Sequence, residues 1–225
     1  MSEERVTEVW RRYKDCASCG LAATRNNVVF GTGNPAADIL IVKDAPSNAE
    51  DRRGTHLTTD LQWLCKVYKA AFNSRTSLET VAEKLLERVF IVSATMCAGI
   101  HEAGEVAGTH RKVSDAEVKA CRPRLIDTLY AVDPLVVIAY GNRASRALFG
   151  ARTGIDRTGT ALTTLEVPGV LGGVIAYSVI VAPDLADAER AGDYTYKEGK
   201  VASITNSLKR AFELADAINH EDSPR

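Results

Sequence analysis

Four short apolar runs, each rich in β-branched residues and bounded by turn residues, stand out along the 225 residues of this chain. They lack the polar alternation of a strand with one face in water, and this pattern is typical of strands buried on both faces in a parallel sheet. The runs cover residues 38–42, 89–92, 135–139 and 177–181. We therefore predict four parallel strands at the centre of the fold.

Segments with apolar residues at helical spacing separate these runs. Ser114 and Glu117 form a capping-box signature that opens one helix. Asn142 is placed to cap a short helix that ends at Leu148. The other expected helices cover residues 3–14, 59–72, 78–87 and 201–218, and the glycine-rich stretch 152–173 is compatible with a hairpin. Helices between parallel strands imply right-handed crossovers. The sequence thus predicts an α/β fold, a three-layer αβα sandwich around a four-stranded parallel sheet.

Composition limits the class of protein further. With 45% hydrophobic residues the chain can bury one full core, and we expect a single domain over residues 1–219 with a disordered tail at 220–225. No run of 18 apolar residues occurs and the first residues are charged, so we predict a soluble cytoplasmic protein that does not enter a membrane. The net charge of -1 gives no global signature of nucleic-acid binding, which would then depend on local basic clusters.

Polar residues follow the first predicted strand at its carboxyl end. Asp44 comes directly after the apolar run, and the loop that follows mixes acids with Arg52 and Arg53. In open α/β sheets, ligands bind outside the carboxyl ends of the strands. Asp44 is therefore the first candidate for chemistry, although an acid at this place also caps turns. The arginines suit phosphate contacts or a solvated surface.

Five cysteines suggest a metal or cluster site. Cys16 and Cys19 form a close C-x-x-C pair, Cys97 follows the second predicted strand, and Cys121 lies in the helix opened by Ser114. In a cytoplasmic chain such a set indicates metal binding more than disulfides. Spacing alone leaves zinc, an iron–sulfur cluster and ordinary buried cysteines open. Cys65, inside a predicted helix, is interpreted as a small core residue.

One stretch of sequence carries a resemblance to a known family. The segment GTGNPAADILIV, followed by Asp44-Ala45-Pro46 and then Glu50-Asp51-x-x-Gly54, resembles the first motif of the uracil-DNA glycosylase superfamily, in its iron–sulfur branch, family 4. The similarity extends from Cys16 to about Val181. Tyr140-Gly141-Asn142-Arg143-Ala144 is similar to the family's glycine-then-helix segment. The resemblance implies the uracil-DNA glycosylase-like fold and, rather than zinc, a [4Fe-4S] cluster held by Cys16, Cys19, Cys97 and Cys121.

A narrower resemblance concerns the long segment between Cys97 and Cys121. It looks like the extended loop of the UdgX-type branch, whose histidine traps the sugar as a covalent adduct after uracil leaves. Counting back from Cys121 places His110 at that histidine. For an isolated histidine, a plain surface position is the alternative.

The residues expected at the base pocket depart from the family pattern. Asp44 stands where the family has a glutamate, and Ala45, beside Pro46, replaces the glutamine of the UdgX-type proteins. Leu57 occupies the position of a phenylalanine that stacks on the base, and Ser93 occupies the position of an asparagine that reads the pyrimidine edge. Ala182 replaces the histidine of the His-Pro motif. The loss of one preorganised donor costs roughly 3 to 4 kcal/mol of transition-state stabilisation. We therefore expect weak excision of ordinary uracil.

Three functions are compatible with these residues. The first is a DNA glycosylase, a hydrolase of base excision repair, that excises uracil or a modified pyrimidine with Asp44 and His110 as catalytic residues. The second is a catalytically degenerate iron–sulfur protein that binds nucleic acid, and the third is a phage-type enzyme that acts on modified DNA bases. In each case we expect a nucleoid-associated monomer whose partner is single-stranded or duplex DNA. The candidate DNA contacts are Arg52, Arg53, Arg143 and Leu185, of which Leu185 either wedges into the DNA or packs inward.

Overall fold

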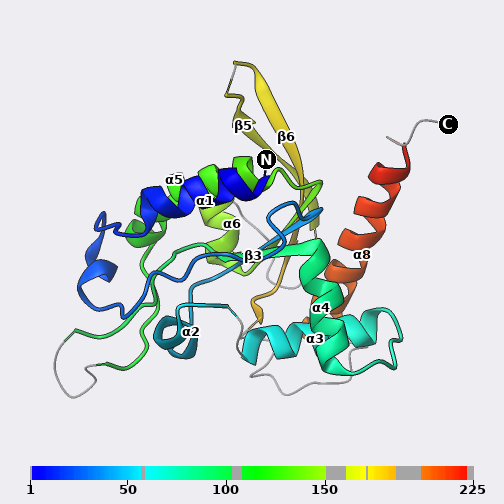
Figure 1. Ribbon diagram of the computed structural model, residues 1–225, viewed down its shortest axis with the longest axis horizontal. Coiled ribbons are helices and arrows are strands. Elements are labelled where there is room, and N and C mark those ends of the chain that lie inside the picture. The colour runs from blue at the N-terminus through cyan, green and yellow to red at the C-terminus, as the bar shows by residue number, and fades with distance from the viewer. Residues whose placement is uncertain are drawn as a thin grey trace.

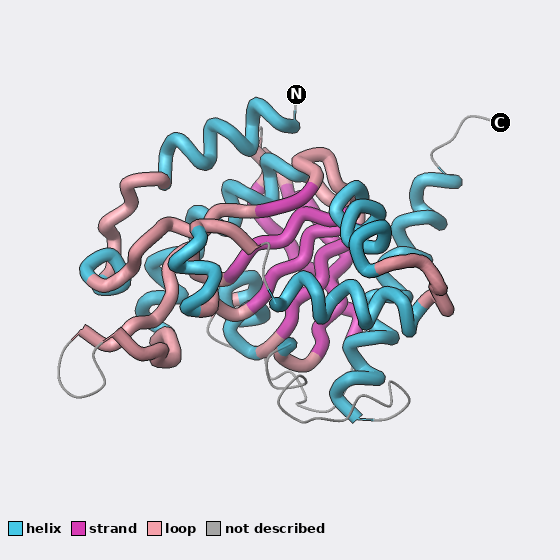
Figure 2. Tube along the Cα trace, turned by 60° about the horizontal axis from the view of Figure 1, so that its bottom comes forward, coloured by secondary structure: helices cyan, strands magenta, loops and turns pink. Residues whose placement is uncertain are grey.

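The computed structural model describes residues 2–56, 59–102, 108–150, 161–170, 172–185 and 199–221. A sheet crosses the centre of the molecule, and helices cover both of its faces (Figure 2). In the described residues this sheet has six strands in the order β1-β3-β2-β4-β6-β5. The fold is therefore the α/β fold that the hydrophobic pattern predicts.

The sheet has two strands more than the sequence predicted. Its parallel centre consists of β3 (Val89–Ser93), β2 (Ile39–Lys43), β4 (Val136–Tyr140) and β6 (Val174–Ala182). The edge strands β1 (Thr32–Gly33) and β5 (Ala161–Pro168) run antiparallel to their neighbours. Neither edge strand has the buried apolar run that predicts a central strand, because β1 is very short and β5 is largely exposed. With β6, β5 forms the hairpin of the glycine-rich stretch.

The two faces of the sheet carry separate cores, so the fold has three layers. Leu40 and Val42 point into the core on the side of α1 (Ser2–Tyr13), α5 (Asp115–Val132) and α6 (Asn142–Phe149). Ile39 and Ile41 point into the opposite core, beside α3 (Thr59–Ala71), α4 (Leu78–Arg88) and α8 (Gly199–Glu221). All four side chains are fully buried. Burial on both faces explains why the strand sequences do not alternate.

Local signals placed most helix ends correctly. The Ser114–Glu117 capping box at the start of α5 is present. The same S-x-x-E signature at Ser47 and Glu50 opens α2 (Asn48–Arg53), a helix in what the sequence analysis treated as a polar loop. The N-cap of α6 is Gly141, with φ of 89°, and not Asn142, which is the first helical residue. Near the carboxyl end, α8 continues through Glu221, so the helix includes the first two residues of the expected tail.

The amino-terminal helix α1 packs on the face of the sheet that α5 and α6 also cover. Helix α1 lies along α5 (Figure 1), and Asp127 of α5 accepts hydrogen bonds from Arg12 Nη1 at 2.9 Å and from Tyr13 Oη at 2.8 Å. None of the helices in the described residues has the length and apolar character needed to cross a bilayer.

Candidate functional site

The carboxyl ends of the four parallel strands bring most of the predicted site residues to one edge of the sheet. Asp44 follows β2, Ser93 ends β3, and Ala182 ends β6 beside Tyr140 of β4. Lys43 pairs in register with Ser93. The amide of Ala94 donates to the carbonyls of both Lys43, at 2.8 Å, and Asp44, at 3.0 Å. This edge is the ligand-binding side of an open α/β sheet.

Asp44 is held in place by an arginine. Its Oδ2 accepts a hydrogen bond from Arg143 Nη1 at 2.7 Å, and Arg143 Nε donates to the carbonyl of Val113 at 2.9 Å. The other oxygen, Asp44 Oδ1, is buried and has no hydrogen-bond partner among the described residues. Arg143, a candidate DNA contact, is therefore tied to the candidate catalytic carboxylate. Since an unpaired buried acceptor is costly, Oδ1 marks a place for a donor from a ligand or water.

A charged cluster lies next to Asp44 and was not singled out as functional from the sequence. Lys43 Nζ donates to both carboxylate oxygens of Glu50 at 2.7 Å, and His56 Nδ1 lies 3.0 Å from Glu50 Oε1. These three side chains, called here the buried triad, are 5%, 0% and 2% exposed in the order Lys43, Glu50, His56. The signals in the sequence were a lysine at the end of an apolar run and Glu50 within the first family motif.

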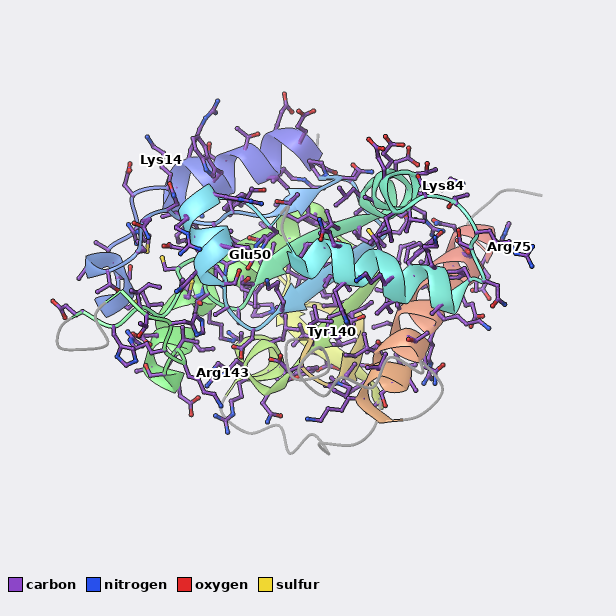
Figure 3. The ribbon with its side chains drawn as sticks, turned by 90° about the horizontal axis from the view of Figure 1, so that it is seen from below. Lys14, Glu50, Arg75, Lys84, Tyr140 and Arg143 are labelled. Carbon is purple, nitrogen blue, oxygen red and sulfur yellow. The ribbon has the colours of Figure 1, made fainter. Side chains whose placement is uncertain are left out.

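Hydrogen bonds and charges within the buried triad keep Glu50 ionised. Burial alone raises the pKa of Glu50, but the contacts with His56 and Lys43 outweigh it and lower this pKa to about 2. Glu50 Oε2 also accepts from the amide of Ser47 at 2.7 Å. Glu50 is thus the shared acceptor that joins β2, the start of α2 and the segment after it, and Figure 3 shows it together with Tyr140 and Arg143.

The expected base-pocket residues are mostly buried. Ser93 is 2% exposed, and its Oγ has no hydrogen-bond partner in the described part of the chain. Ala182, at 4%, lies in the core on the α3 and α8 side. Pro46 is buried, and Ala45 is half-buried against the core on the α1, α5 and α6 side. Leu57 lies outside the described residues.

His110 occupies a short backbone ladder on the long segment after Cys97. It forms an isolated antiparallel bridge with Ile100, and the amide of Arg111 donates to the carbonyl of Gly99 at 2.7 Å. The Arg111 guanidinium forms two hydrogen bonds with Glu117, at 2.7 and 3.1 Å, which lower the pKa of Glu117 to about 2 against the opposing effect of burial. The side chain of His110 is exposed.

The remaining candidate DNA contacts differ in exposure. Arg52 and Arg53 are exposed in the last turn of α2. Leu185 is 6% exposed and packs in the core on the α3 and α8 side, so the inward alternative is the one observed. A buried leucine is not placed to wedge into DNA.

The four cysteines of the expected cluster lie on three segments. Cys16 and Cys19 precede the short helix η1 (Gly20–Ala23), Cys97 follows β3, and Cys121 lies on α5. Burial raises the pKa of Cys97 to about 11, with Arg25 opposing this and nearby Cys121 and Cys19 adding to it. Burial likewise raises the pKa of Cys19, with contributions from Cys121 and Cys16. Cys19, Cys97 and Cys121 therefore lie within electrostatic reach of one another, and Cys16 lies within reach of Cys19.

Two guanidinium groups face the sulfurs of this cysteine group. Arg25 Nη1 donates to Cys97 Sγ at 3.3 Å and to the carbonyl of Cys16 at 2.6 Å, and Arg124 Nη2 lies 3.7 Å from Cys121 Sγ. Cationic donors favour the thiolate form, which is the form that binds metal. In the described residues, no group of three or more histidine, cysteine or acidic side chains is arranged so that it could hold a metal ion. Cys65 lies at 2% exposure in the opposite core, as expected.

The sequence places the chain in a family. Residues 30–195 match the profile of the Uracil DNA glycosylase superfamily, which is more than half of the chain, and the chain belongs to this superfamily.

Curated relatives point to one branch of it. The chain is 26% identical over 146 residues to "Type-4 uracil-DNA glycosylase" of Archaeoglobus fulgidus, covering 65% of this chain and 64% of that protein. It is 27% identical over 142 residues to the protein of the same name from Thermotoga maritima, covering 63% and 65%. The chain thus spans just under two thirds of the length of these relatives. The resemblance to family 4 is confirmed, and the closeness to the UdgX-type branch stays a prediction.

Proposed function

We propose that this chain is a DNA glycosylase that hydrolyses the N-glycosidic bond of uracil or of a modified pyrimidine. The observation that carries this proposal is Asp44, oriented by Arg143 at the ligand-binding edge of the sheet with Oδ1 buried and without a partner among the described residues. Membership of the superfamily and the similarity to relatives named uracil-DNA glycosylases support it. Such an activity would place the protein at the DNA inside the cell.

Asp44 suits the charge that develops in this reaction. Breaking the glycosidic bond leaves positive charge on the sugar and negative charge on the base, after the nucleotide has been turned out of the stack. A carboxylate near the sugar stabilises the cation or orients the attacking water. Because Arg143 occupies Oδ2, Oδ1 is the oxygen that would act.

The base would be read by a reduced set of groups. Ser93 Oγ is a single hydroxyl where an asparagine would offer a bidentate amide, and Ala182 offers no donor. Both changes lower affinity for uracil, so a base that needs fewer donors from the protein is a better substrate. Leu57 is expected to complete the pocket as an apolar wall.

His110 is proposed as the nucleophile or general base of the reaction. Its backbone is fixed by the bridge to Ile100, and three residues later Val113 accepts the hydrogen bond of Arg143. The segment that carries His110 is therefore connected to the arginine that orients Asp44.

The cysteine group is proposed to hold a [4Fe-4S] cluster. The proposal is supported by the electrostatic contacts among Cys19, Cys97 and Cys121 and between Cys16 and Cys19, and by the two facing guanidinium groups. The similarity to relatives named type-4 uracil-DNA glycosylase, together with the sequence resemblance to the iron–sulfur branch, supports it further. When bound, the cluster would cross-link the amino-terminal arm, the segment after β3 and helix α5. This role is structural, since metal binding of this kind is coupled to folding.

The test is incubation of the purified protein with oligonucleotides that carry uracil or other modified pyrimidines, followed by alkali and a denaturing gel. We expect strand cleavage that Asp44→Asn abolishes, and a slow-migrating crosslinked band that His110→Ala abolishes. Glu83→Gln, on the exposed face of α4, and His220→Ala, at the exposed end of α8, are matched controls. If folded protein gives neither product on any substrate, the proposal of a glycosylase is wrong.

The buried triad favours a second candidate, a protein that binds DNA without excising a base. Lys43 stands where the family has a glycine, and its side chain lies beside Ser93 on the same face of the sheet. A lysine and its two partners there reduce the room for a base, and Ala182 removes a donor. DNA binding in the absence of any cleaved or crosslinked product would support this candidate.

A further inference from the structure

A cleft between helices α5 and α6 combines positive charge, an apolar floor and an aromatic ring. Its volume is about 610 Å³, within the usual range for small-molecule sites. Lys119, Arg122 and Arg146 line it together with one acid, Asp115. The apolar part of the wall is formed by Ala116, Val118, Ala147 and Phe149. Neither the cysteine group nor the Asp44 site uses these side chains.

The charge of this α5–α6 cleft differs from that of the chain as a whole. Three cations and one acid give its lining a surplus of positive charge, whereas the whole chain has a net charge of -1. Arg146 Nη1 is paired with Asp115 at 2.7 and 2.8 Å, and the Arg122 guanidinium is anchored by a bond from Nη2 to the carbonyl of Leu148 at 2.8 Å. An anion is therefore the ligand that the cleft favours.

The position of the α5–α6 cleft relates it to the Asp44 site. Arg143 and Arg146 are three residues apart on α6 and so lie on neighbouring parts of one helix face. Arg143 contacts Asp44, and Arg146 lines the cleft. At about 1.5 Å of rise per residue, the Cα atoms of the two arginines are roughly 4.5 Å apart along the helix axis. Helix α6 thus carries one arginine at the Asp44 site and another in the wall of the cleft.

We propose that the α5–α6 cleft binds an unpaired nucleotide of a DNA strand, adjacent to the nucleotide held at Asp44. The phosphate would lie against Lys119, Arg122 and Arg146, and the base would stack on Phe149 over the apolar floor. This arrangement of cations and an aromatic ring is the one that binds single strands without sequence preference. A base that stays paired in a duplex cannot enter the cleft, so the site gives a preference for single-stranded DNA. The inference rests on DNA being the substrate, as proposed above.

The experiment measures binding of a labelled single-stranded oligonucleotide without uracil, and of the same sequence as a duplex, by fluorescence anisotropy over a series of salt concentrations. We expect the double variant Lys119→Gln/Arg146→Gln to bind the single strand at least tenfold more weakly. The magnitude of the slope of log K against log salt should fall by about 0.7, since one phosphate contact to a single strand contributes roughly that amount. Duplex binding should change much less.

Two further variants test whether stacking contributes to single-strand binding and whether the loss of any surface charge would weaken it. Phe149→Leu keeps an apolar side chain and should still weaken single-strand binding by roughly 5-fold or more, through the loss of stacking. Lys209→Gln/Arg210→Gln removes two exposed charges from α8, on the other side of the sheet, and should leave binding unchanged. Thermal unfolding confirms that each variant is folded.

The possible results are distinct. Single-strand binding that is unchanged in Lys119→Gln/Arg146→Gln, or single-strand and duplex binding that weaken equally, would overturn the nucleotide site. The excision assay on the wild type is scored separately. If no base is excised but binding still depends on the cleft, the nucleotide site stands and only the proposed glycosylase activity fails.

Discussion

Replacement of Glu50 by glutamine tests whether the buried triad holds the site together. The Glu50 carboxylate accepts two hydrogen bonds from Lys43 Nζ and one from the Ser47 amide, and His56 Nδ1 lies 3.0 Å away. In Glu50→Gln one oxygen becomes an NH₂ group that faces donors, and Lys43, 5% exposed, loses its counter-charge. Removing one partner of a buried ion pair costs roughly 3 to 5 kcal/mol. We expect a loss of that size in urea unfolding at pH 7.

The pH dependence of stability gives a second measure of the same interaction. The pKa of Glu50 falls from its ordinary 4.5 to about 2 in the folded protein. Because the folded pKa is the lower one, this stabilisation is present above about pH 4.5 and is lost as pH falls towards 2. At roughly 1.4 kcal/mol for each unit of pKa difference, the stabilisation amounts to roughly 3.5 kcal/mol. Over that range the wild type should lose this amount more than Glu50→Gln does, because the lowered pKa of Glu117 contributes equally in both proteins.

An exposed glutamate serves as the control for the stability effect of Glu50→Gln. Glu83→Gln, on the exposed face of α4, should leave both the stability at pH 7 and its pH profile unchanged. The double variant Lys43→Met/Glu50→Gln should regain much of the lost stability, since it leaves no unpaired charge buried. A cost below about 1 kcal/mol for Glu50→Gln alone would contradict the reasoning, because an ion pair buried this fully cannot lose one member so cheaply.

Three further changes have defined outcomes. Gly141→Ala should cost roughly 1 to 3 kcal/mol and lower Tm, because φ at this position is +89° and the new Cβ would lie 2.8 Å from Asp184 Oδ2; an unchanged Tm would contradict this. Asp51→Asn should speed hydrogen exchange at the amides of Asn26 and Asn27, which bond to the Asp51 carboxylate at 3.1 and 3.3 Å, while exchange in α8 stays as it was. Cys97→Ser should lose the iron and the colour of the proposed cluster, measured by metal analysis and visible absorbance, whereas Cys65→Ser should keep both; equal iron content in the two variants would refute the proposed ligand set.

The sequence determined the elements of the fold because their signals are local. Ile39 to Val42 form an unbroken apolar run, which is typical of a strand buried on both faces, and all four side chains are fully buried. The Ser114 capping box fixed the start of α5 through groups three residues apart. The cysteine spacing and the first motif likewise sufficed for the family. The edge strands β1 and β5 gave no such signal, since neither has a buried run of its own.

Only the tertiary structure decided how the site residues are paired. Asp44 and Arg143 are 99 residues apart, and they meet because α6 packs over the carboxyl end of β2. The sequence assigned Arg143 to DNA and Leu185 to a possible wedge, whereas packing engages the first with a carboxylate and buries the second. The buried triad depends in the same way on α2 folding back onto the end of β2. Local patterns determine whether a residue lies in a strand or a helix, but the partner of a polar side chain is decided by which elements pack together.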